Sequence, residues 1–196
     1  MHRILTAIAT ATIVSLLTSC NEERPTEESK PLLIEGIRAT ASAEQIAADC
    51  ETALARAYSE FAALEAQTGE ATVASVFGQY EKVSDALAPI GDVWHLRSVH
   101  PDADIRAAAN ACSEQQSDFF SQTDLSRPYY DRVAAIDISQ LTEVERYMVV
   151  KTLADFRRNG VDKDEETRKK IRELQNEITA IGNEFDKNIR EDVGSV

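Results

Sequence analysis

Apolar residues recur every three or four positions over most of the chain beyond residue 41, which is the spacing of an α-helix with one buried face. The pattern predicts helices over 42–68, 73–88, 101–119 and 127–136, followed by two longer helices within 141–192. The period-two alternation that marks a half-buried strand is missing. We therefore predict an all-α fold, an antiparallel helical bundle with a long carboxy-terminal helical hairpin.

The first arm of this hairpin carries signals for both of its ends. Thr142 and Glu145 have the spacing of a capping box, in which each side chain bonds the other residue's backbone N–H. Asn159 and Gly160 end the helix, because glycine readily takes the left-handed conformation found after a helix C-terminus. The apolar residues between these signals cover more than half of the helical circumference, which predicts a central, buried helix. They are Tyr147, Met148, Val149, Val150, Leu153, Ala154 and Phe156.

The second arm is predicted to run from Asp164 to Asp192 and to carry one narrow apolar stripe. The residues of this stripe alternate at spacings of three and four, as in a coiled coil. A stripe of this width packs on one partner, so we expect the two arms to form an antiparallel pair joined by a polar elbow at 157–160. The stripe consists of Ile171, Leu174, Ile178, Ile181, Phe185 and Ile189.

Two segments of the chain carry a family resemblance. The elbow Arg158-Asn159-Gly160 is followed later by Phe185-Asp186-Lys187-Asn188-Ile189-x-Glu191-Asp192, and Val99-His100-Pro101-Asp102 with Ile105-Arg106 lies upstream. In this order they resemble the amino-terminal helical region of the thimet oligopeptidase family of zinc metallopeptidases, which includes oligopeptidase A and dipeptidyl carboxypeptidase. The resemblance spans Ile37 to Asp192. It gives a structural role in the family motif to Arg158, Asn159, Gly160, Phe185, Asn188, Glu191 and Asp192.

The resemblance implies a function for a larger protein than this chain. In the family, the amino-terminal lobe walls one side of a deep channel that admits short peptides, and the other lobe carries the zinc and its ligands. The H-E-x-x-H motif of that other lobe is absent from these 196 residues. We therefore expect a partial lobe of a mostly helical enzyme, inactive alone, with zinc only in a missing catalytic half that is itself a partner of this chain.

The histidines do not offer a substitute zinc site. Of the three, His2 lies at the very start of the chain, and His95 and His100 are five residues apart with Pro101 directly after the second. That spacing cannot present two imidazoles on one helical turn, as an H-E-x-x-H helix does. We expect packing or surface roles for both, no metal site and no cofactor in this chain, and we name no catalytic residue.

The amino-terminal segment has the pattern of a cleaved signal peptide. A basic start precedes the apolar run Ile4–Leu17, which is too short to span a bilayer comfortably. Leu17-Thr18-Ser19-Cys20 resembles a bacterial lipobox, although ordinary signal cleavage with Cys20 as an incidental thiol is the alternative. We expect a lipoprotein signal peptide at 1–19, lipid attachment at Cys20, a disordered acidic tether at 20–31 and an incomplete helical lobe at 32–196. The protein would then be exported and anchored to a bacterial membrane, facing the periplasm or the cell exterior.

Cys50 and Cys112 lie on the apolar faces of separate predicted helices. A disulfide between them would close a loop of about 60 residues, for which chain entropy gives about 4 kcal/mol of stabilisation. Two separate buried thiols fit the pattern equally well. Trp94, Tyr129 and Tyr130 are candidates for lining a peptide channel, but core or rim packing is the more common role of such aromatic residues.

Charge narrows the range of partners without choosing among them. The chain has 21 Lys and Arg against 34 Asp and Glu, a net charge of −13, which argues against nucleic acid as a partner. A chain of this length can also bury a core of its own. The alternative function is therefore a complete, non-enzymatic helical lipoprotein that binds a peptide or protein partner in a groove between its hairpin and the earlier helices.

Overall fold

A computed structural model describes residues 41–192, and this part of the chain is helical without any strand. The all-α prediction is confirmed. None of the helices in the described range is long and apolar enough to cross a membrane. The elements are α1 (Ala43–Glu65), α2 (Val73–Leu87), the 3-10 helix η1 (Ala88–Ile90), α3 (Val93–Val99), α4 (Ala103–Asp124), α5 (Arg127–Ala134), α6 (Glu143–Asn159) and α7 (Glu165–Glu191).

Short polar side chains fix where the helices begin. Thr142 and Glu145 form the predicted capping box at the start of α6, and the Asp164 carboxylate accepts from the Thr167 N–H at the start of α7. The predicted start of α4 at Pro101 is wrong by two residues. The Asp102 carboxylate accepts hydrogen bonds from the backbone N–H groups of Asp104 and Ile105. Asp102 is therefore the N-cap of α4, and Pro101 lies before the helix.

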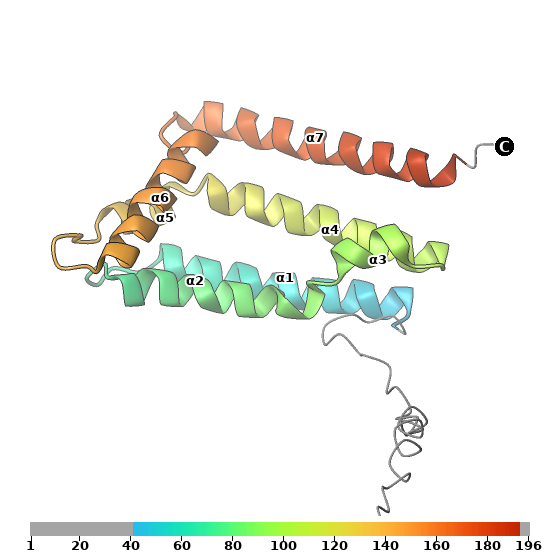
Figure 1. Cartoon of the computed structure of the whole chain (residues 1–196), viewed down its shortest axis with the longest axis horizontal. Coiled ribbons are helices and arrows are strands. Elements are labelled where there is room, and N and C mark those ends of the chain that lie inside the picture. Colours follow the sequence, from blue (N-terminus) through green and yellow to red (C-terminus); the bar gives the residue numbers. More distant parts are fainter. Residues whose placement is uncertain (1–40, 193–196) are drawn as a thin grey trace, which may run out of the picture. The chain divides into compact units, whose positions relative to one another are not determined.

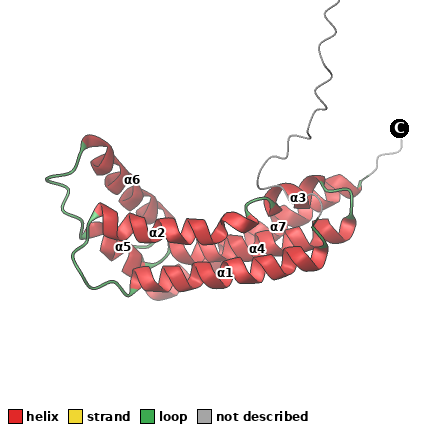
Figure 2. Cartoon of the chain, turned by 90° about the horizontal axis from the view of Figure 1, so that it is seen from below, coloured by secondary structure: helices red, strands yellow, loops and turns green. Residues whose placement is uncertain are grey.

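The helices pack around a core that α1 and α4 share. α1 contacts α2 on one side and α4 on the other, and α4 also packs against α3 and α7. Figures 1 and 2 show α1, α2, α4 and α7 running along a common direction, with α6 crossing them at one end. Edge-on aromatic contacts from Phe61 to Phe119 and Tyr129, and from Tyr129 to Phe156, join α1, α4, α5 and α6.

The arms predicted as a hairpin do not pair along their length. α6 packs on α5, whereas α7 lies along α4, as Figure 1 shows. The predicted central position of α6 is also wrong: Val149 and Phe156 are buried, but Tyr147 is 67% exposed. The two arms do not pair because polar residues of α7 form hydrogen bonds with α4 instead. One of these bonds joins Asn176 on α7 to Asp118 on α4.

Candidate functional site

The elbow between α6 and α7 depends on one glycine. Gly160 has φ of 97°, in the left-handed region that side chains other than glycine rarely adopt, and its N–H bonds back to the carbonyls of Phe156 and Arg157. A Cβ added at Gly160 would lie 2.6 Å from Cδ1 of Ile171 on α7. The predicted elbow is therefore present, and close approach of α7 adds a second reason for glycine there.

Side chains next to Gly160 form hydrogen bonds that connect the elbow to α4 and α5. Asn159 Nδ2 donates to Asp124 Oδ2 at 3.2 Å, which links the end of α6 to the end of α4. Arg157 Nε donates to the Tyr130 hydroxyl at 3.1 Å. Arg158 forms an exposed ion pair with Asp155 on its own helix. Of the predicted motif residues, Asn159 and Gly160 thus have defined structural roles here, and Arg158 lies on the surface.

Asp124 shares a cavity with two tyrosine side chains, and the pKa of its carboxyl is raised there. A cavity of about 320 Å³ between α2, α4, α5 and α6 is lined in part by Asp124, Tyr80, Tyr129 and Asn159. Loss of hydration there raises the pKa of the Asp124 carboxyl, although the residue keeps an exposed edge. Burial, followed by the nearby Asp124 charge, raises the pKa of Tyr80. Asp124 was not singled out from the sequence, because nothing local marks it among the many acids.

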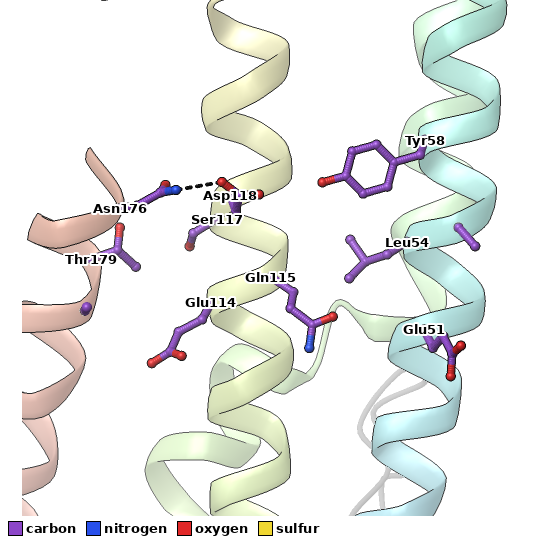
Figure 3. A pocket seen from close by; sticks show the side chains of 11 residues that line it. Glu51, Leu54, Tyr58, Glu114, Gln115, Ser117, Asp118, Asn176 and Thr179 are labelled. Carbon is purple, nitrogen blue, oxygen red and sulfur yellow. Dashed lines mark hydrogen bonds between the residues drawn. The ribbon is translucent and has the colours of Figure 1, made fainter. Parts of the chain in front are cut away.

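A groove that could hold an extended ligand lies between α1, α4 and α7 (Figure 3). It has a volume of about 510 Å³. Asp118 on α4 is one of the lining residues. Its carboxylate accepts hydrogen bonds from Asn176 on α7 at 2.6 Å and from Gln122 at 2.6 Å, and Gln122 also donates to the Tyr58 hydroxyl at 3.1 Å. Burial and the Asp118 charge raise the pKa of Tyr58. The groove expected from the sequence lay between the carboxy-terminal hairpin and the earlier helices, whereas this one involves only α7 of the two predicted arms.

Two of the three helices that line this groove, α1 and α4, are joined by a disulfide. Cys50 on α1 and Cys112 on α4 form a disulfide in the structure, with their Cα atoms 5.8 Å apart, and both residues are buried. Leu54 and Gln115, each within about one helical turn of a bridged cysteine, line the groove. The bridge therefore fixes the spacing of α1 and α4 close to these lining residues.

A buried arginine that the sequence analysis missed holds the far end of α7. Arg97 on α3 is 5% exposed, and its Nη1 donates to Asn183 Oδ1 at 2.7 Å while its Nη2 lies 3.5 Å from the Asp186 carboxylate. Asn183 Nδ2 in turn donates to Glu114 on α4 at 3.1 Å. The guanidinium also stacks 3.9 Å from the ring of Trp94. The sequence does carry a signal for this contact with α4. Asn176 and Asn183 are two turns apart and therefore lie on one face of α7.

The remaining predicted motif residues lie at the opposite end of α7 from the elbow. Phe185 and Asn188 are exposed, and the Asn188 carbonyl accepts from the Asp192 N–H at 2.9 Å at the end of the helix. Glu191 is the last residue of α7. The structure therefore does not bring the two parts of the motif together. Cys20, with the signal peptide and the tether predicted at 1–31, lies outside the described residues.

The residues considered for chemistry do not converge. No group of three or more histidine, cysteine, aspartate or glutamate side chains within 41–192 is placed to hold a metal ion. His95 lies on α3, and His100 Nδ1 accepts from the Asp102 N–H at 3.1 Å. These residues do not fit a catalytic zinc. Of the aromatic candidates, Tyr129 is core and Trp94 stacks on Arg97.

Comparison with known proteins identifies the family of this chain. Residues 50–186 match the family described as neurolysin/thimet oligopeptidase, N-terminal domain. The chain belongs to this family, and the match covers the family's amino-terminal domain. The resemblance read from the elbow and the Phe185 segment is confirmed.

Several curated relatives agree. Mitochondrial intermediate peptidase of Phaeosphaeria nodorum (strain SN15 / ATCC MYA-4574 / FGSC 10173) is 30% identical over 111 residues, which are 54% of this chain and 14% of the relative. Mitochondrial intermediate peptidase of Arabidopsis thaliana is 28% identical over 119 residues, 59% of this chain and 17% of the relative. Organellar oligopeptidase A of Arabidopsis thaliana is 25% identical over 114 residues, 56% and 14% respectively. The chain thus matches less than one fifth of the length of each of these relatives.

The same comparison corrects the expected localisation. An exported bacterial lipoprotein on a membrane facing the periplasm or cell exterior was expected from residues 1–20. That expectation is wrong, because the relatives are named as mitochondrial proteins or, for oligopeptidase A, as a chloroplastic and mitochondrial one. The expectation rested only on a short pattern, an apolar amino-terminal run followed by a cysteine.

Proposed function

We propose that this chain forms one wall of the peptide channel of a zinc-dependent oligopeptidase that acts on short peptides, and that its catalytic half lies outside these 196 residues. The observation that carries the proposal is the family match over 50–186, which identifies an amino-terminal domain. The described residues supply no fitting zinc ligands, so no catalytic step is assigned to them.

The contribution of this chain is to bind and orient a peptide. The groove between α1, α4 and α7 is lined by the Glu51, Glu114 and Asp118 carboxylates, and the Tyr58 side chain points toward Asp118 (Figure 3). Carboxylates accept hydrogen bonds from peptide N–H groups and attract a cationic amino terminus or basic side chain. The disulfide between α1 and α4 keeps these acceptors at fixed spacing, which lowers the cost of ordering a bound peptide.

Complementation tests the proposal. The purified chain is mixed with organellar oligopeptidase A of Arabidopsis thaliana from which the matched 114 residues have been removed. We expect neither part alone to cleave a quenched fluorescent peptide, and the mixture to cleave it in a chelator-sensitive way. A mixture that forms no complex and shows no activity would contradict the proposal.

A second candidate function is favoured by the groove itself. A non-enzymatic helical module would bind peptides there without any further part. Titration of the chain alone with a labelled, unstructured basic peptide tests this reading. Saturable binding that Asp118→Asn weakens at least about tenfold, with Asp131→Asn on α5 as the matched control, would support the binding module over the channel wall only together with no complex between the chain and the truncated oligopeptidase A.

A further inference from the structure

α7 packs on the rest of the chain through its polar side. Asn176 donates to Asp118 on α4, and Asn183 bridges Arg97 on α3 and Glu114 on α4. Asn183 is the buried residue on this face. A helix that turns amide side chains toward its neighbour leaves its apolar side elsewhere, because residues on opposite faces differ by about half a turn.

The apolar stripe of α7 faces away from α4. At 3.6 residues per turn, the stripe lies about opposite Asn176 and Asn183 on the helix. Ile178, Ile181 and Phe185 are 67%, 60% and 64% exposed, and Leu174 and Ile189 are exposed as well. Figure 1 shows α7 at the edge of the helix arrangement, with α4 on one side and no other helix on the opposite side. A continuous apolar row of this kind marks an interaction surface.

The spacing of the stripe specifies the shape of what covers it. Alternating steps of three and four residues form a seam for one partner helix, with the side chains of each helix inserted between those of the other. α7 has 27 residues, so the seam is about 40 Å long at most. Glu177 and Glu184 border one edge of the seam and favour basic residues on the partner beside them.

We propose that the outward stripe of α7 is the docking face for an amphipathic helix of the catalytic half. This inference rests on the proposed function. It commits to that occupant because the matched relatives are far longer than the match, which covers 14–17% of their length, and so contain ample further chain to cover the stripe. Glu177 and Glu184 on the edge of the stripe would pair with basic residues on that helix.

Binding of stripe variants to the truncated oligopeptidase A tests the assignment. Ile178→Glu and Ile181→Glu place a charge in the seam, and Val99→Glu on α3 is the matched control, since Val99 is 76% exposed but not on α7. All three should keep the wild-type melting temperature, because each side chain is already in water. We expect the two seam variants to weaken binding about thirtyfold or more, and the control to leave it within about threefold.

Each other outcome has a distinct meaning. Equal binding of wild type and seam variants would overturn the docking face while leaving the channel-wall proposal intact. No binding of the wild-type chain would count against the proposed function itself. If light scattering shows a wild-type dimer that Ile178→Glu dissociates, and that dimer does not bind the truncated enzyme, then a second copy is the occupant and the inference is wrong.

Discussion

At the scale of single residues, Gly160 is the position where backbone conformation and packing impose the same requirement. Its φ of 97° disfavours any side chain, and a Cβ at this position would approach Ile171 to 2.6 Å. Gly160→Ala should therefore lower the free energy of unfolding by about 1–2 kcal/mol, the usual cost of the left-handed conformation. Urea denaturation followed by circular dichroism measures the change.

Gly182 provides the matched control for this prediction. It lies inside α7, has no positive φ, and a Cβ there would meet nothing within 4 Å. Gly182→Ala should stabilise the chain by about 0.5–1 kcal/mol, because alanine loses less backbone entropy in a helix. Equal effects of the two substitutions would contradict the role assigned to Gly160.

The raised pKa of Asp124 predicts a dependence of stability on pH. Because the folded state binds this proton more tightly than the unfolded state, the carboxyl costs stability once pH rises through its folded pKa, and the cost is absent below the ordinary aspartate pKa of about 3.9. Asp124→Asn keeps an acceptor for Asn159 without the charge. The variant should melt higher than wild type at about pH 7, and the difference should shrink toward about pH 3. A pH-independent difference would contradict burial as the cause.

At the scale of helices, local signals and packing partners differ in how well the sequence predicts them. The starts at Thr142 and Asp164 and the end at Gly160 were predicted, because a cap is decided by residues within one turn. The partner of α7 was not, because an apolar stripe shows that a helix has a partner but not which one. The hydrogen bonds of Asn183 with Arg97 and Glu114 join segments distant in sequence, so the local sequence pattern predicts them only weakly.

The attachment of α7 can be tested at Asn183. Asn183→Ala removes the acceptor of the buried Arg97 guanidinium, and hydrogen bonds to charged groups contribute about 1.5–3 kcal/mol. We expect a loss of this size in unfolding free energy. Asn188→Ala, an exposed amide on the same helix, should change it by less than about 0.5 kcal/mol. Hydrogen exchange should also rise in the last turns of α7 in the first variant, and its absence would contradict the anchoring role.

At the scale of the molecule, the disulfide joins the two central helices. Reduction of Cys50–Cys112, separated by 62 positions, should lower stability by about 4 kcal/mol if loop entropy dominates. Thermal melts with and without dithiothreitol measure this effect. The Cys50→Ala/Cys112→Ala double variant should not respond to the reductant. An identical melting temperature of the wild-type chain in both conditions would show that the bridge does not stabilise the fold.

The candidate site was predictable only in part. The family motif identified the elbow, and the helical phase of Cys50 and Cys112 placed both thiols in the interior. The groove itself depends on how three helices meet, and Asp118 carries no local mark that separates it from other surface acids. The outward stripe of α7 was visible in the sequence, but its exposure follows from a polar contact with α4 that only the fold reveals.

The most direct test of the channel-wall account is a peptidase assay on the purified chain alone, with zinc content measured in the same sample. We predict a helical protein by circular dichroism that contains no stoichiometric zinc and does not cleave a quenched fluorescent peptide, because a catalytic zinc needs three well-placed ligands and a group that accepts a proton. Chelator-sensitive hydrolysis that His95→Ala or His100→Ala abolishes would contradict the account, since it would place a catalytic centre within this chain.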